Sequence, residues 1–322
     1  MMDFTPAGSQ QAVAALAAEI LTEPDPWKEL AQAGLLDATS LGLLDITTLL
    51  TEIGRRSPSL KAHATLMTGA FPLLRWGRAD LLPVGLALTA ALREPSDPEP
   101  DPPATAITNE TITGTKIGVP YAGQSDLILV PAATGVALVD PRAQRVTLTR
   151  TPTSSGEPEY TLRMDGAPIS GMLGGADCVR DLYQLSVAGA CALADGAVAG
   201  ALALTRDHVA TRQQFGRPLA AFQAVSQQIA DVYIASRTMH LAAVSACWRL
   251  DAGLDASADL GVAGYWCAEQ APRSVRTCHH LHGGLGMDVT YPLHRFSSLV
   301  ADLVRYLGGA EYRLERHACS ST

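Results

Sequence analysis

The proline-rich segment from Arg93 to Pro103 divides this chain into parts with different periodicity. It contains five prolines and no large apolar side chain, so it cannot continue a helix, and it has little to bury. Before it, apolar residues recur at helical spacing; after it come short β-branched runs separated by Gly, Pro and Asp. The segment is therefore predicted to be a loop between a helical part and a β-domain.

The pattern on either side of this loop predicts most of the secondary structure. Helical spacing covers residues 10–21, 27–35, 44–53 and 60–74. Short strands are predicted at residues 106–108, 111–114, 127–130, 135–139 and 145–148. Long helical segments return at roughly 181–208, 219–250, 257–285 and 296–317, and their short connections favour an antiparallel bundle.

The predicted fold class is therefore α+β and mostly helical. We expect an N-terminal helical domain over residues 1–92, a middle β-domain over 93–180 and a C-terminal four-helix bundle over 181–322.

Composition narrows the possible partners and location. Hydrophobic residues make up 47% of the chain and charged residues 17%, which is typical of a compact globular protein. The net charge is −8 and no basic run is present, which argues against nucleic acid as a partner. The apolar run Leu81–Leu92 is too short to span a bilayer, and none of the six cysteines forms a C-x-x-C pair. We expect a cytoplasmic protein with free thiols and no membrane contact.

Two motifs in the C-terminal half point to a phosphate-containing ligand. The run from Arg212 to Pro218 reads RQQFGRP and is followed by Phe222-Gln223, while His282 to Gly286 reads HGGLG. An arginine side chain can bind a diphosphate bidentately. Paired glycines let the backbone approach a ligand closely.

These motifs, with Gly114-Thr115-Lys116 in the β-domain, closely resemble those of the acyl-CoA dehydrogenase family. The first matches its R-x-x-F-G…F-Q signature, the second its G-G-x-G segment and the third its N-G-x-K turn. The order of helices, β-domain and bundle also matches, over nearly the whole chain.

The resemblance implies an FAD site shared between two subunits. In the family, the flavin ring rests on one subunit, and the neighbour's bundle holds the ADP part. By resemblance, Arg212 contacts the diphosphate, Phe215 packs near the adenosine, and His280 stands where glutamine is common. The full set of cofactor-binding residues implied here is Arg212, Gln214, Phe215, His280, Gly283 and Gly284.

The catalytic half of the family site is missing from this sequence. The family's base is a glutamate that removes the substrate α-proton while a hydride moves from the β-carbon to the flavin. Leu307 and Ser186 occupy the two positions where family members carry this base, and neither can act as one. The W-x-T that contacts the flavin ring is replaced by Gly118-Val119-Pro120. No catalytic residue is therefore assigned to this chain.

This combination resembles the smaller, base-lacking subunit of heteromeric acyl-CoA dehydrogenases of bacterial steroid and cholesterol side-chain degradation. The implied partner is a larger homologous subunit in an α2β2 heterotetramer that carries the glutamate and the flavin pocket. The implied substrate is a steroid side-chain CoA thioester, and the implied electron acceptor is electron-transfer flavoprotein.

Two other interpretations remain open from the sequence. The chain could be a catalytically dead scaffold that kept the fold but no cofactor. It could also be a homo-oligomeric dehydrogenase with Glu311, one helical turn after Leu307, as a displaced base. The cluster His279, His280 and His282 lacks the spacing and partners of a metal site, so no metal is expected.

Overall fold

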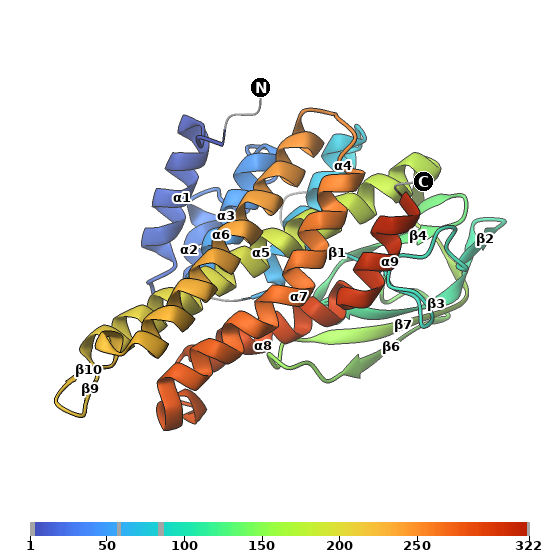
Figure 1. Ribbon diagram of the computed structural model, residues 1–322. Coiled ribbons are helices and arrows are strands. Elements are labelled where there is room, and N and C mark those ends of the chain that lie inside the picture. Colours follow the sequence, from blue (N-terminus) through green and yellow to red (C-terminus); the bar gives the residue numbers. More distant parts are fainter. Residues whose placement is uncertain (1–3, 57–58, 83–86, 321–322) are drawn as a thin grey trace.

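The chain folds as a helical N-terminal part, two small β-sheets and a long helical bundle (Figure 1). The computed structural model describes residues 4–56, 59–82 and 87–320. The N-terminal part contains α1 (Gly8–Ile20), α2 (Pro26–Gln32), α3 (Leu43–Arg56), the π-helical segment η1 (His63–Ala70), α4 (Phe71–Arg75) and the 3₁₀ turn η2 (Ala79–Leu81). These elements cover all four helical segments predicted for this part.

Two four-stranded sheets follow. One has the order β1-β4-β5-β8 and the other β2-β3-β7-β6. The strands are β1 (Leu88–Ala90), β2 (Ala106–Thr108), β3 (Thr111–Pro120), β4 (Leu127–Ala132), β5 (Gly135–Val139), β6 (Val146–Thr151), β7 (Glu159–Pro168) and β8 (Gly171–Leu173). The five predicted strands are present. Sequence reasoning missed β7, β8 and β1, which lies before the proline-rich segment and pairs in parallel with β4.

The sheet that contains β4 and β5 is buried on both faces. Leu129 and Leu138 belong to the core shared with the helices, while Ile128 and Val139 belong to the core between the two sheets. Neighbouring side chains of a strand point to opposite faces, which explains this division. The sheet is therefore a middle layer that connects the helices to the outer sheet.

The C-terminal helices form the longest part of the molecule. They are α5 (Ala176–Thr211), α6 (Gln223–Asp251), α7 (Ser257–His282), α8 (Leu293–Tyr306) and α9 (Ala310–Ser320). The prediction of one helix over 296–317 was wrong, because the chain breaks at Leu307-Gly308-Gly309. Both glycines have positive φ, at 84° and 89°, which ends a helix. The fold class, α+β and mostly helical, is confirmed.

Helix α5 is the central helix of the molecule. It packs against α3, α6, α7 and α8. Helix α5 is long and apolar enough to cross a membrane. However, 78% of its apolar 18-residue stretch is buried inside the protein. At the crossing with α3, a Cβ on Gly196 would lie 2.0 Å from the carbonyl oxygen of Thr51, and one on Gly54 would lie 2.3 Å from that of Leu193. The two backbones therefore touch, and only glycine fits at these positions.

The proline-rich segment is a loop, as predicted, but it is firmly attached. Glu94 is 5% exposed and pairs with Lys116, whose side chain is fully buried, at 2.9 Å between Oε1 and Nζ. The Glu94 carboxylate also accepts hydrogen bonds from the amides of Ala104 and Thr105. The expectation that this segment has little to bury was wrong for these polar groups, because charged partners satisfy them inside the protein.

We predict that breaking this buried pair strongly destabilises the fold. Lys116→Met leaves Glu94 without its cationic partner, and Glu94→Gln leaves the Lys116 ammonium without its anion. Each should lower the free energy of unfolding by about 3–5 kcal/mol, because an unpaired charge remains buried. The double variant should cost less than the sum of the two. Urea unfolding followed by circular dichroism measures all three.

Arg206→Met is the matched control, because Arg206 pairs with Asp207 on the surface, where both side chains are more than 60% exposed. Surface pairs contribute little, so this variant should unfold like the wild type. Equal destabilisation by Lys116→Met and Arg206→Met would contradict the role given to the buried pair.

Candidate functional site

Two of the sequence-predicted cofactor residues meet in one pocket at the C-terminal end of α5. Arg212 is the residue that caps α5, and Gly284 follows the end of α7. The pocket is lined by His208, Thr211, Arg212, His282, Gly284 and Leu285. The Arg212 side chain is exposed and makes no ion pair with any residue that the structure describes. Its guanidinium is therefore available to an anionic ligand.

The glycine pair leaves open space beside the pocket. Gly283 ends α7 with φ at 58°, in a region that disfavours other residues. A Cβ at Gly283 or Gly284 would meet no other atom within 4 Å. The glycines are therefore not required by packing within this chain, and the open backbone suits a ligand or another chain. Gly283 itself is not among the residues that line the pocket.

The remaining predicted cofactor residues lie outside this pocket. Gln214 is in β9 (Gln213–Gln214), which forms a tight hairpin with β10 (Arg217–Pro218). Phe215 stands at the tip of the hairpin, with φ at 52° and 91% of its surface exposed. His280 is exposed on α7. Within this chain, these three side chains therefore point to solvent.

Two histidines of α7, His279 and His282, are held by protein partners. His279 bonds through Nδ1 to the carbonyl oxygen of Gly286 at 2.9 Å and through Nε2 to Ser297 at 3.0 Å. His282 bonds through Nδ1 to the carbonyl oxygen of Cys278 at 2.8 Å and through Nε2 to the Tyr291 hydroxyl at 3.0 Å. Across the described ranges, no group of three or more His, Cys, Asp or Glu side chains could hold a metal.

One of the two predicted base positions, Ser186, contacts the residue next to the other, Leu307. The hydroxyl of Ser186, on α5, lies 2.7 Å from the hydroxyl of Tyr306, the residue before Leu307. Leu307 is 1% exposed. Burial raises the pKa of Tyr306 to about 12, so the phenol is neutral at physiological pH. The Ser186–Tyr306 contact therefore consists of neutral side chains, while the Arg313 guanidinium donates to the carbonyl oxygen of the adjacent Leu307.

His63 completes this neutral cluster. Its Nε2 lies 2.9 Å from the carbonyl oxygen of Ser186, and its ring meets that of Tyr306 edge-on at 5.3 Å between centroids. Burial lowers the pKa of His63 to about 4, so the imidazole is neutral and donates from Nε2. His63 has no exposed surface, so it is not accessible as a base. Sequence reasoning missed this residue.

The nearby carboxylates do not replace the missing base. Glu311 lies in the first turn of α9, where it is exposed. Asp181 accepts a hydrogen bond from the Trp76 indole at 3.0 Å and pairs with Arg75 at 3.0 Å. Neither side chain lies at the Ser186–Tyr306 contact.

The region expected to contact a flavin ring is filled from within the chain. Gly118 lies at a break in the β3–β7 register, with φ at 64°. A Cβ there would lie 3.0 Å from a guanidinium nitrogen of Arg93. Val119 has no exposed surface, and Pro120 offers no amide hydrogen. The residues present therefore fit the ADP part of FAD at Arg212 but do not fit the flavin ring.

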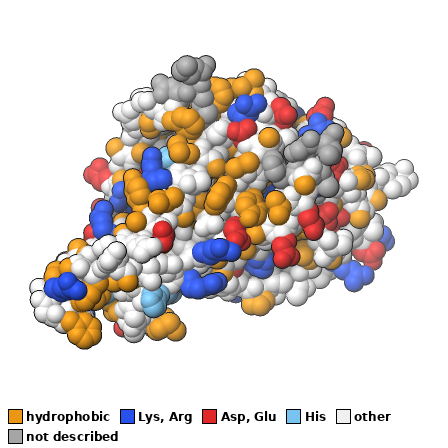
Figure 2. Space-filling model, in the orientation of Figure 1, with side chains coloured by type: hydrophobic (Ala, Val, Ile, Leu, Met, Phe, Trp, Pro, Cys, Tyr) orange, Lys and Arg blue, Asp and Glu red, His pale blue; other side chains and the backbone are white. Residues whose placement is uncertain are grey.

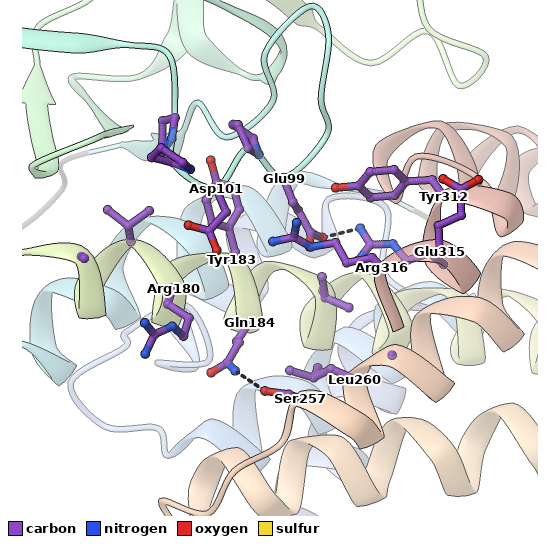
Figure 3. A pocket seen from close by; sticks show the side chains of 18 of the residues that line it. Glu99, Asp101, Arg180, Tyr183, Gln184, Ser257, Leu260, Tyr312, Glu315 and Arg316 are labelled. Carbon is purple, nitrogen blue, oxygen red and sulfur yellow. Dashed lines mark hydrogen bonds and ion pairs between the residues drawn. The ribbon is translucent and has the colours of Figure 1, made fainter. Parts of the chain in front are cut away.

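A second cleft, of about 570 Å³, lies between the proline-rich segment, α5, α7 and α9 (Figure 3). Glu99 projects from the segment toward α9 and pairs with both Arg313 and Arg316. On the opposite side, the Gln184 amide meets Ser257 at 3.5 Å. Two guanidinium groups therefore hold the buried carboxylate of Glu99, while Asp101 and Glu315 line the same cleft with exposed carboxylates.

Sequence reasoning missed two residues of the Arg212 pocket, His208 and Thr211. His208 lies four residues before Arg212, which places both on one face of α5. The spacing of His208 and Arg212 could have identified His208 from the sequence, but only His279, His280 and His282 were considered as ligands.

Comparisons with known proteins identify the family of the chain. Residues 182–314 match the family model described as the acyl-CoA dehydrogenase C-terminal domain. The chain is 47% identical to acyl-CoA dehydrogenase FadE28 of Mycobacterium tuberculosis, over 98% of this chain and 97% of that protein.

Two solved structures share the fold. The ChsE4-ChsE5 complex from Mycobacterium tuberculosis superposes with a TM-score of 0.91 at 28% identity, covering 99% of each chain. The Tcur3481-Tcur3483 steroid ACAD variant gives a TM-score of 0.87 at 29% identity, covering 96% of each chain. The chain therefore belongs to the acyl-CoA dehydrogenase family, whose members are FAD-dependent oxidoreductases.

Proposed function

We propose that this chain is the base-lacking subunit of a heteromeric acyl-CoA dehydrogenase. It grips the ADP part of an FAD with Arg212 and the open backbone at Gly284. A larger homologous partner supplies the flavin pocket and the catalytic glutamate. The reaction would be the α,β-dehydrogenation of an acyl-CoA thioester, for which bound FAD would supply the hydride acceptor and the partner's glutamate the base for the α-proton.

The separation of the two half-sites along α5 carries this proposal. Ser186 and Arg212 are 26 positions apart on this helix, which at a rise of about 1.5 Å per residue is about 39 Å. One dinucleotide is too short to reach both ends. This chain therefore binds the ADP part of an FAD whose flavin ring lies on another chain.

The side chains at the predicted base positions of this chain are not suited to remove a substrate proton. Leu307 has no acceptor, the Ser186 hydroxyl is tied to a neutral tyrosine, and His63 is sealed inside. The alternative that Glu311 is a displaced base has no geometric support, because this side chain points to solvent. If the chain were only a scaffold, the unpaired Arg212 side chain and the open space at Gly283 and Gly284 would have no function.

Exposed apolar side chains support assembly with a partner. Phe215, Met287 and Val289 are 91%, 84% and 77% exposed at the end of the bundle that carries the β9–β10 hairpin. Figure 2 shows hydrophobic side chains at this end and along α6 and α7. Clusters of this kind mark interaction surfaces. A homologous subunit in an α2β2 tetramer would cover them.

The relatives guide the choice of partner and substrate. Two of the solved structures are complexes of two named chains, and one of them is described as a steroid acyl-CoA dehydrogenase. We therefore infer a steroid side-chain CoA thioester as substrate and electron-transfer flavoprotein as acceptor.

We predict that Arg212→Ala weakens FAD binding by the assembled complex about ten- to hundredfold. Loss of a charge-assisted contact to the diphosphate costs about 1.5–3 kcal/mol. Flavin fluorescence measured during FAD titration of the stripped complex gives the Kd. Arg217→Ala is the control, because the Arg217 guanidinium lies over the Phe222 ring at 4.1 Å and outside the pocket. Equal Kd values for both variants would contradict the ADP grip.

We also predict two FAD per four chains in the complex with the larger subunit. Each pair of chains would make one competent site, and the reciprocal site would stay empty because Gly118-Val119-Pro120 stands where the family resemblance expects the ring contact and Arg93 lies against Gly118. Absorbance and quantitative amino-acid analysis give the ratio.

In the same complex, replacing the partner's glutamate with glutamine should abolish exchange of the substrate α-proton, whereas Glu311→Gln in this chain should leave turnover unchanged. Four FAD per tetramer, or a loss of α-proton exchange in Glu311→Gln, would contradict the assignment of ADP binding to this chain and of the catalytic base to its partner.

A further inference from the structure

The Arg212 pocket contains a pair of stacked imidazoles. The rings of His208, on α5, and His282, on α7, lie 4.4 Å apart between centroids with their planes 19° from parallel. Both residues line the pocket together with Arg212. Two titratable rings contact each other beside the Arg212 guanidinium. The charge of this group of side chains therefore depends on pH near neutrality.

His282 is the fixed member of the pair. Its Nδ1 donates to the Cys278 carbonyl oxygen, which leaves Nε2 to accept from the Tyr291 hydroxyl. Burial, with smaller contributions from His208 and His279, lowers the pKa of His282 against the effect of its backbone hydrogen bond. With both nitrogens engaged, His282 is a neutral platform and not a ligand.

His208 is the free member of the pair. It is partly exposed, and neither of its ring nitrogens has a hydrogen-bond partner among the residues that the structure describes. The stack on His282 fixes the plane of its ring. His208 lies one helical turn before Arg212, so both side chains line the same pocket.

The charges that face His208 come from both helices. On α5 these are Arg212 and the neighbouring Asp207, which pairs with Arg206 at 2.8 Å. On α7 the nearest titratable group is His282, and Tyr291 lies beyond it. Burial first, and then the positive charge of Arg212, lower the pKa of His208, so its ring is neutral in the empty pocket at physiological pH.

We propose that His208 is a second, proton-dependent ligand for the diphosphate that Arg212 grips, so that this pocket takes up a proton when it binds its dinucleotide. This inference rests on the proposed ADP-binding function of the pocket. An anion beside Arg212 cancels the charge that opposes protonation of His208, and the protonated imidazole then donates to a phosphate oxygen. The C-terminal end of α5 also favours a cation at this position.

The direction of the pH dependence follows from this linkage. The pKa of His208 is below its usual value in the empty pocket and is raised when the anion is bound. Between these two values, FAD affinity increases as pH falls, by at most about tenfold per pH unit. Above the higher value and below the lower one, His208 no longer contributes a slope.

FAD binding to the stripped complex of both subunits tests this inference. Its Kd is measured by flavin fluorescence from pH 5.5 to 8, and proton uptake is measured by calorimetry in two buffers of different ionisation enthalpy. The wild type should bind several-fold more tightly at pH 5.5 than at pH 8, with proton uptake. His208→Phe keeps a ring stacked on His282 but cannot bind a proton. The contribution of His208 to the pH dependence of the Kd and to the proton uptake should therefore be lost.

His208→Gln is the second variant, in case loss of polarity disturbs the helix end, and it should behave like His208→Phe. Arg217→Gln is the control, because the Arg217 guanidinium lies over the Phe222 ring outside the pocket, and this variant should keep the wild-type slope. Wild-type slope and proton uptake in both His208 variants would overturn the inference. If Arg212→Ala then still weakened FAD binding, the proposed function would stand; if it did not, the ADP grip itself would fail.

Discussion

The contact between α3 and α5 is the constraint on which the rest of the structure depends. Because Gly54 and Gly196 bring the two backbones into contact, α5 is held in the middle of the protein along its length. The same helix carries Ser186 in its buried half and Arg212 at its end. Its position therefore sets both the Ser186–Tyr306 contact and the Arg212 pocket.

Periodicity predicted most of the fold because apolar residues recur at helical or strand spacing in most elements. Helix α5 and strands β4 and β5 are instead buried on nearly all sides and are recognised by their apolar composition. The missed strands have local reasons. β1 and β8 have three residues each, too few for a pattern, and β7 alternates only in part between buried and exposed positions. The break at Gly308-Gly309 was visible in the sequence, but the apolar spacing of the helices on both sides concealed it.

The site was predictable where motif residues act through the backbone or a single charge. Arg212 and Gly284, more than 70 positions apart in sequence, line one pocket, and Ser186 meets the residue beside Leu307. Phe215, Gln214 and His280 face solvent in this chain, so their predicted contacts depend on a neighbouring subunit. His208 and His63 were not predicted, because their roles arise from contacts between helices that no local pattern records.

The position of Arg93 against Gly118 ties the shape of this region to the stability of the fold. Arg93 belongs to the same segment that holds Lys116 through Glu94 and α9 through Glu99. A single change of Leu307 to glutamate would place a carboxylate where the Arg313 side chain already bonds to the Leu307 carbonyl, with no space prepared for a ring. The residues from Arg93 to Glu99 are therefore part of the framework of the fold. A substitution at Leu307 alone would leave this segment in place, and opening space at Gly118 would require the segment to be rebuilt.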